Sequence, residues 1–208
     1  DEKLTKEKEF LGFYLSSHPL DKYKDIITAF SINKLSEIDV EESKVIKTFG
    51  TITGLKKVLT KKDEQMALFS ILCYDRIISC IAFPKTYDKF LEEIIEKKTV
   101  YIEGKIQIDE YKGEKTIKLL VEKIISLDKL YDYPAKKIFI LIEEEDRYKY
   151  SRLRELINSN KGKIEFLFAI KNKDEKRIQN PGVKVKLSRE FLEQLVELMG
   201  LEKIKIQM

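Results

Sequence analysis

The order of β-rich and helical runs between residues 44 and 130 is the feature that most constrains the fold of this chain. Three runs rich in β-branched and aromatic residues come first, then a helix opened by a proline, then two more β-rich runs. The strands are expected at 45–58, 66–73, 77–83, 99–108 and 115–126, and the helix at 84–97. This order predicts a small five-stranded barrel with one helix inserted after its third strand.

That order is typical of the OB fold, a Greek-key barrel with a helix between strands three and four. Gly50 and Gly54 lie inside the long first run, where a strand can kink or bulge. They support the assignment, because the first strand must bend to serve both sides of the barrel. A β-meander with an inserted helix is the alternative. We therefore predict an OB-type domain over residues 44–130.

Residues 135–208 contain runs typical of strands and helices in the order β-α-β-β-α-β. Pro134 lies in the linker before them, Ser188 is a good N-cap, and Gly200 is a good stop for the last helix. The order predicts a ferredoxin-like α+β domain. Residues 1–43 are expected to form a helical lead-in segment, so the whole chain is α+β and mainly β.

Four lysines flank the turn between the first two strands. Lys56, Lys57, Lys61 and Lys62 have no acidic residue among them. In OB folds this loop helps to hold a nucleic-acid backbone, and flexible ammonium groups neutralise phosphates without requiring a fixed geometry. The alternative is a solvated turn that keeps a sheet edge soluble. We predict contact with DNA at this turn.

Other cations and aromatics are candidates for the same groove. Arg76 lies at a hairpin tip, and Lys112 and Lys115 lie around the turn between strands four and five, beside Glu110 and Glu114. Base stacking requires exposed aromatic rings. The candidates for stacking are Phe49, Phe69, Phe83, Tyr101 and Tyr111. Core packing is the alternative for each phenylalanine, and we include Phe49 and Tyr111 in the predicted site.

Several kinds of chemistry are absent from the sequence. One histidine and two cysteines cannot form a structural zinc site. No glycine-rich phosphate loop, nucleophile elbow or pair of carboxylates at catalytic spacing is present. We expect no catalytic residue, metal or cofactor in this segment. The chain has two cysteines and shows neither a signal peptide nor an apolar run of about 18 residues. We therefore expect a cytoplasmic chain without membrane contact.

The segment at 7–23, EKEFLGFYLSSHPLDKY, resembles a signature of bacterial DNA polymerase III alpha subunits, replicative polymerases of the C family. Its most specific parts are Gly12-Phe13-Tyr14-Leu15 and His18-Pro19-Leu20. Phe83-Pro84 with Tyr87, and Ile102-Glu103-Gly104, also fit that family. The resemblance covers nearly all of the chain, which begins at Asp1 without an initiator methionine and is expected to be a fragment of a longer protein.

The resemblance implies a non-catalytic part of a DNA-directed DNA polymerase, which is a nucleotidyltransferase. It implies that the OB domain touches single-stranded template, that the C-terminal domain binds the tau subunit of the clamp loader, and that both act with the rest of the polymerase chain in the replisome. Two alternatives stay open. One is an OB scaffold without DNA binding, and the other is an RNA-binding domain of a tRNA-handling enzyme.

Two shorter features have simple structural interpretations. Gln65-Met66-Ala67-Leu68-Phe69 resembles a sliding-clamp-binding peptide, but such peptides dock in extended form from flexible segments, and this run is expected to be an internal strand. His18 has no nucleophile or carboxylate at a telling spacing. We therefore expect His18 to be a structural hydrogen-bonding residue.

Overall fold

The structure is a computed structural model that describes residues 18–37, 41–74, 76–111, 114–132, 135–171 and 176–207. The side chains of Tyr111, Glu114 and Lys176 are outside the described part. The chain divides into two compact units, one of residues 1–22 and 32–128 and one of residues 23–31 and 129–208. The first 17 residues of the expected helical lead-in segment, which spans residues 1–43, lie outside the described residues. The expected lead-in segment is therefore shared between the two units.

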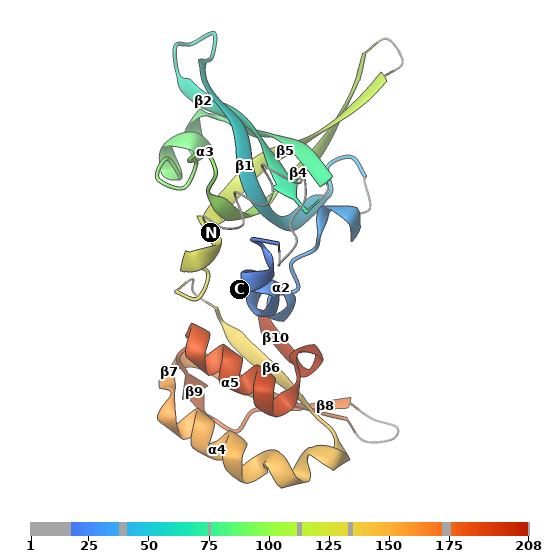
Figure 1. The fold of residues 1–208 in the computed structure, drawn as a ribbon, viewed down its shortest axis with the longest axis vertical. Helices are drawn as coiled ribbons and strands as arrows, with labels where there is room; N and C mark the ends of the chain where they lie inside the picture. Colours follow the sequence, from blue (N-terminus) through green and yellow to red (C-terminus); the bar gives the residue numbers. More distant parts are fainter. Residues whose placement is uncertain are drawn as a thin grey trace. The chain divides into compact units, whose positions relative to one another are not determined.

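The first unit contains the predicted barrel. Five strands close in the order β1-β2-β3-β5-β4, with β1 also paired to β4 and with β3 and β5 parallel (Figure 1). The strands are β1 Val45–Leu59, β2 Gln65–Cys73, β3 Arg76–Ala82, β4 Thr99–Tyr111 and β5 Glu114–Ser126. Helix α3, Pro84–Lys89, connects β3 to β4. This is the OB topology, so the predicted fold of this region is confirmed.

The α3 helix is shorter than its sequence pattern suggests. Its last residue is Lys89, although the sequence predicts a helix that continues to residue 97. The chain must instead turn back to β1, where the Ile52 N–H donates to the Lys98 carbonyl and the Lys97 N–H donates to the Ile52 carbonyl. These bonds to the barrel end the helix before its pattern ends.

The barrel core requires two glycines where strands approach closely. A Cβ on Gly104 would lie 2.3 Å from the carbonyl oxygen of Leu120, and one on Gly50 would lie 2.7 Å from that of Leu72. Both obstacles are backbone atoms, which cannot rotate away. The inward-facing side chains, among them Phe69, Ile102 and Leu119, are almost fully buried behind these strands.

Replacing Gly104 with alanine is expected to destabilise the protein by about 1–3 kcal/mol, because β4 and β5 must separate to admit the methyl group. Thermal unfolding followed by circular dichroism measures the effect. Lys105→Ala on the same strand is the control, since its ion pair with Glu122 is exposed and contributes less than about 1 kcal/mol. Equal melting temperatures for the two variants would contradict the close approach.

The second unit is an open sheet covered on one face by two helices. The strands lie in the order β10-β6-β7-β8, and β9 pairs with the first part of β7, whereas β8 pairs with its last part. The strands are β6 Lys137–Ile142, β7 Lys161–Lys171, β8 Lys176–Gln179, β9 Lys184–Val185 and β10 Ile204–Gln207. The main helices are α4 Tyr150–Ser159 and α5 Arg189–Met199. Figure 1 shows α4 and α5 side by side over the sheet.

The class of this unit is α+β as predicted, but the ferredoxin-like arrangement is wrong. That motif is split, with another strand inserted between the two strands that flank the first helix. Here β6 and β7 are direct parallel neighbours, for example Ile140 opposite Phe168. The following strand, β8, instead pairs with the outer edge of β7. Strand order depends on pairing across the sheet, which the order of elements alone does not determine.

Short helices complete the two units. In the second unit α2, Lys24–Ala29, packs against α5 and β10, and its side chains Ile26 and Ile27 are buried. The 3-10 turns are η1 Asp21–Tyr23, η2 Leu35–Glu37, η3 Leu127–Lys129, η4 Glu144–Lys149 and η5 Leu201–Lys203. The Ser188 hydroxyl accepts a hydrogen bond from the Phe191 N–H, and Gly200 ends α5 with a positive φ of 90°, so both predicted caps are confirmed.

Candidate nucleic-acid interface

A β-bulge in β1 sets the direction of the lysine-bearing hairpin. The pairing with β2 shifts between Thr53 and Lys56, and Gly54 adopts a φ of +63° there. The Glu96 carboxylate accepts hydrogen bonds from the N–H groups of Gly54 and Leu55, at 3.1 and 2.9 Å. Bulges bend a strand and re-aim the side chains that follow. Glu96 therefore stabilises the bend that carries Lys56 and Lys57 away from the barrel.

The four predicted lysines are exposed but do not share one face. Lys56 pairs with Leu68 and Lys57 with Ala67, so strand alternation points their side chains to opposite sides of the hairpin. Lys61 and Lys62 lie in the β1–β2 turn. Within the described part of the chain, none of the four has a carboxylate within 4 Å. The cluster is therefore available to an anionic partner, and Lys56, which pairs with Leu68, is the lysine that strand pairing places on the outer face.

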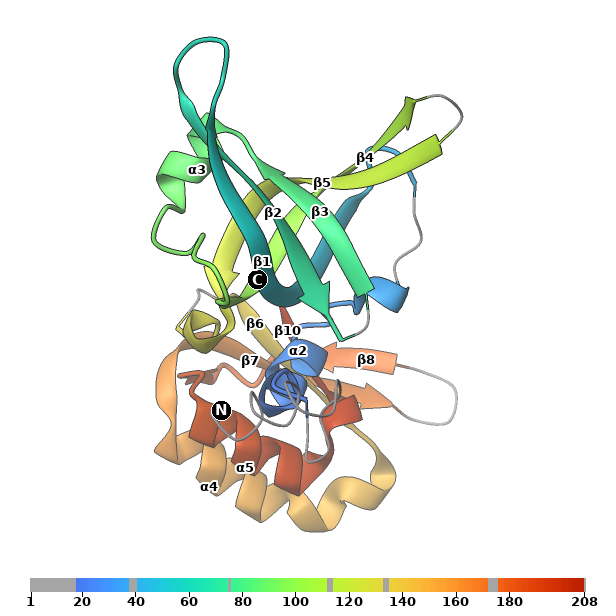
Figure 2. The ribbon, with the colours of Figure 1, turned by 45° about the horizontal axis from the view of Figure 1, so that its top comes forward.

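Two hairpins border an open outer face of the barrel. Figures 1 and 2 show the β1–β2 and β4–β5 hairpins projecting from the barrel and diverging, with β2 and β3 between them in Figure 2. Alternate residues of β2 and β3 point inward and are buried, such as Phe69 and Cys80, while their neighbours point outward. In OB folds this strand face and the loops beside it are the usual binding surface.

A row of polar side chains crosses this outer face. The strand pairing aligns Thr53 with Ser70, Ser70 with Ser79, Ser79 with Lys118, and Lys118 with Gln107. Ser79 is exposed and the others are partly exposed. Hydroxyl and ammonium groups are donors that suit phosphate oxygens. The row, which we call the polar row, lies between two aliphatic rows, Leu68–Ile81 and Leu72–Ile77.

One carboxylate holds the lysine of the polar row in place. The Lys118 Nζ donates to Asp109 Oδ2 at 2.7 Å, and the Gln107 amide donates to Asp109 Oδ1 at 2.7 Å. The hydrogen bond from Lys118 is the main cause that holds the pKa of Asp109 below its usual range. Asp109 stays ionised at neutral pH and orients Lys118 on the surface. Sequence reasoning missed Lys118, although the buried Leu119 beside it places Lys118 on the outer side by alternation.

The prediction that Phe49 stacks on a base is wrong. Phe49 is 1% exposed and packs edge-on against Tyr74, with ring centroids 6.2 Å apart. Phe69 and Tyr101 are also buried, and of the five candidates only Phe83 is shown to be exposed, at 47%. The Tyr111 side chain lies outside the described part. The outer face of β2 and β3 carries aliphatic and hydroxyl groups in place of a stacking platform.

Arg76 and Lys115 lie away from the lysine hairpin. Arg76 begins β3 at the end of β2 opposite to the β1–β2 turn, and the nine residues of β2 separate these ends by roughly 27 Å. The parallel pairing of Ser79 with Lys118 puts Arg76 level with Lys115. Both are exposed, and Lys115 pairs across the hairpin with Glu110. Lys112 lies outside the described residues.

The β2–β3 turn is anchored by the preceding segment. The rings of His18 and Tyr74 lie 4.6 Å apart, and the Tyr74 hydroxyl donates to Asp21 Oδ1 at 3.2 Å. Burial, followed by this hydrogen bond, raises the pKa of Tyr74 to about 12. His18 Nδ1 accepts from the Leu20 N–H, as expected for a structural residue. Tyr74, two residues before Arg76, is therefore held by contacts with the preceding segment.

The other sequence features are structural. The clamp-like run from Gln65 to Phe69 forms the start of β2, most of which is paired on both edges, so it is not a free peptide. Cys73 and Cys80 are buried, as expected. Among the helices that the structure describes, none has the length and apolar character needed to cross a membrane.

The chain has distant likenesses among solved structures. The mitochondrial single-stranded DNA binding protein Rim1 of S. cerevisiae aligns with a TM-score of 0.36 and 18% identity, over 41% of this chain and 97% of Rim1. The second single-stranded DNA binding protein of Mycobacterium smegmatis aligns with a TM-score of 0.36 and 11% identity, over 40% of this chain and 84% of that protein. No protein-family model matches the chain.

Curated relatives share more of the sequence. The DNA polymerase III alpha subunit of Aquifex aeolicus is 31% identical over 162 residues, which are 76% of this chain and 14% of that protein. The alpha subunit of Halalkalibacterium halodurans is 28% identical over 209 residues, 99% of this chain and 18% of that protein. The chain thus spans less than a fifth of the length of these relatives. It is related along its whole length to the bacterial DNA polymerase III alpha subunits.

Proposed function

We propose that the barrel binds single-stranded template DNA as a non-catalytic module of a DNA-directed DNA polymerase in the cytoplasm. The observation that carries this proposal is the outer face between the two hairpins. It combines Lys56 and the exposed lysines of the adjoining turn, Lys61 and Lys62, with the polar row, and none of these three lysines has a described carboxylate partner. Salt-dependent attraction of phosphates to such cations is the main source of non-specific nucleic-acid affinity. The relationship to DNA polymerase III alpha subunits supports DNA as the ligand.

We further propose that the second unit recruits a replisome partner, the tau subunit of the clamp loader, and that both units act with the remainder of a polymerase chain. The family resemblance motivates this partner. The DNA-binding and partner-binding roles fall on separate units, so each can be tested by variants that leave the other unit unchanged.

The direct test is a fluorescence-anisotropy titration of labelled oligo-dT with the 208-residue chain at several salt concentrations. We expect saturable binding, and we expect the logarithm of the association constant to fall linearly with the logarithm of the salt concentration. Absence of binding at low salt would leave the barrel as a scaffold and refute the proposal. Tighter binding to structured RNA than to oligo-dT would favour an RNA ligand instead.

Lys118→Ala tests the polar row. We expect oligo-dT affinity to fall about fivefold at 0.1 M salt and the salt slope to drop by about 0.7, the contribution of one phosphate contact on a single strand. Lys105→Ala is the matched control, because Lys105 is also paired to a carboxylate across β4 and β5, at 3.0 Å from Glu122, but is outside the row. Equal losses in both variants would show an effect of net charge alone.

A further inference from the structure

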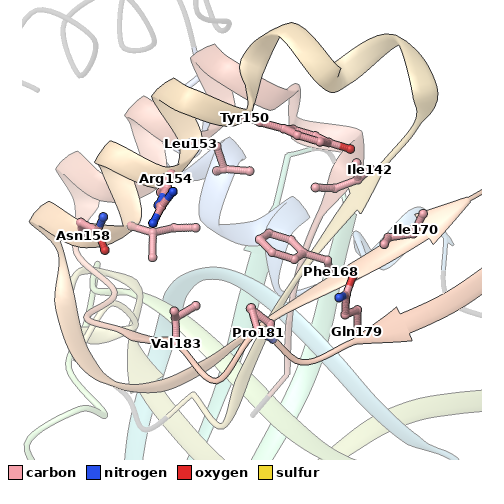
Figure 3. Close-up of a pocket in the computed structure, with 11 residues that line it drawn as sticks. Ile142, Tyr150, Leu153, Arg154, Asn158, Phe168, Ile170, Gln179, Pro181 and Val183 are labelled. Atoms are coloured by element: carbon pink, nitrogen blue, oxygen red, sulfur yellow. The ribbon is translucent and has the colours of Figure 1, made fainter.

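A cavity of about 550 Å³ opens in the second unit between α4 and the outer strands of its sheet (Figure 3). Apolar side chains make most of its lining, from α4 (Leu153, Ile157) and from β7 (Phe168, Ile170). Figure 3 shows Leu153 and Phe168 pointing into the space between the helix and the strands. Its volume falls within the roughly 300–1,000 Å³ of ligand pockets, and a mainly apolar lining with few polar groups is their usual composition.

A single positive charge stands at this cavity. Arg154 is the charged residue among the described side chains that line it, and it is exposed. No carboxylate of the described residues lies within 4 Å of its guanidinium group. Tyr150, Asn158 and Gln179 are the other polar groups of the lining. The cavity therefore favours an occupant that combines an apolar group with a carboxylate.

The cavity opens at an edge of the sheet. β8 is the last strand in the order β10-β6-β7-β8, and among the described strands it pairs with β7 alone. Ile178 on β8 is 65% exposed. Gln179 pairs with Phe168, so both lie on the face that α4 covers. A strand added to such an edge pairs its main chain with β8 and directs alternate side chains to that face.

We propose that this cavity is the docking site for an extended segment of a partner protein that carries an aliphatic anchor beside an acidic residue. The anchor fills the space over Phe168, and the carboxylate pairs with Arg154. The inference deepens the proposed partner-binding role of the second unit and rests on it. A short, charged edge strand that only prevents sheet-to-sheet association is the alternative.

Two arginines of α4 provide a matched test. Arg152 is also exposed, but it lies two residues away, about 200° around the helix, and lines a separate groove that contains Glu155 and Glu190. The probe is a labelled eight-residue peptide of alternating aspartate and leucine, and the same peptide with lysine in place of aspartate is the charge control. We expect the acidic peptide to bind the 208-residue chain, Arg154→Glu to weaken it at least tenfold, and Arg152→Glu to change it less than twofold.

Purified tau subunit is titrated against the same variants. Loss of tau binding in Arg154→Glu but not in Arg152→Glu places tau at this cavity. Specific peptide binding without tau binding would refute tau as the partner while leaving the site intact. The proposed docking site would be overturned if the acidic and basic peptides bound equally well, or if Arg154→Glu left the binding of the acidic peptide unchanged. It would also be overturned if the chain bound decanoate but did not bind the acidic peptide.

Discussion

Replacing Lys56, Lys57, Lys61 and Lys62 together with alanine is expected to lower the affinity for oligo-dT about 100-fold at 0.1 M salt. The estimate takes three effective phosphate contacts, each contributing a slope of about 0.7 on a single strand. Three are counted because Lys56 and Lys57 point to opposite sides of their hairpin. Anisotropy titrations between about 0.05 and 0.3 M salt measure both affinity and slope. The slope should fall by about 2.

The matched control removes four exposed lysines from the second unit, Lys161, Lys163, Lys184 and Lys186. It changes the net charge equally and should leave the affinity within about threefold. Among single variants, Lys56→Ala should weaken binding more than Lys57→Ala. An unchanged salt slope in the barrel variant, or an equal loss in the control, would remove the β1–β2 hairpin from the binding surface.

Replacing Lys203 with methionine is expected to destabilise the second unit by about 3 kcal/mol. The Lys203 Nζ lies 2.7 Å from Asp146 and 3.1 Å from Glu143, and the Asp146 side chain is 1% exposed. Removing one partner of a buried ion pair leaves the other charge uncompensated, at a cost of about 3–5 kcal/mol. Lys149, 3.0 Å from the other Asp146 oxygen, offsets part of that cost. Chemical denaturation followed by circular dichroism measures the change.

The same cluster predicts how stability depends on pH. Burial alone would raise the pKa of Asp146, but hydrogen bonds led by that from Lys203 outweigh it and hold the pKa below its usual range. The hydrogen bond to Asp146 is the main cause that raises the pKa of Lys203 to about 12. The Asp146 contribution is therefore present above a pH of about 4 and is lost as the pH falls through the lowered pKa. The Lys203 contribution is lost as the pH rises through about 12.

Lys205→Met on the neighbouring strand is the control, because Lys205 is exposed. It should leave stability within about 0.5 kcal/mol of the unaltered chain. Lys203→Met should also flatten the loss of stability as the pH falls below about 4. If both variants unfold at the same denaturant concentration and lose stability equally at low pH, the ion pairs of Lys203 with Asp146 and Glu143 contribute no net stability.

The barrel could be predicted from the sequence because the patterns that specify its strands, helix and bends each lie within a few consecutive residues. Each strand carries its own alternation, Pro84 opens the inserted helix, and Gly50 and Gly54 mark the close approach and the bulge of β1. The second unit could not be predicted to the same depth. Its element order was readable, but the adjacency of β6 and β7 depends on pairing between distant segments.

The candidate site divides in the same way. The lysines of the β1–β2 hairpin stand out because charge and turn residues are visible along the chain. The polar row does not, since Ser70, Ser79 and Lys118 become neighbours only through strand pairing. The exposure of Phe49 could not be predicted from its residue type, because it depends on the contact with Tyr74 and on the side of the sheet that Phe49 faces.

The sequence by itself determined the OB topology of residues 44–130, the α+β class of the second unit, the family relationship, and the hairpin that carries the lysines. Hydrophobic periodicity, turn residues and composition are patterns of residues close together in the chain, so they can be recognised from the sequence alone. Only the tertiary structure decided which cations lie together, which aromatic rings are buried, and where the apolar cavity beside Arg154 opens. Those properties arise from register and packing between strands far apart in the chain.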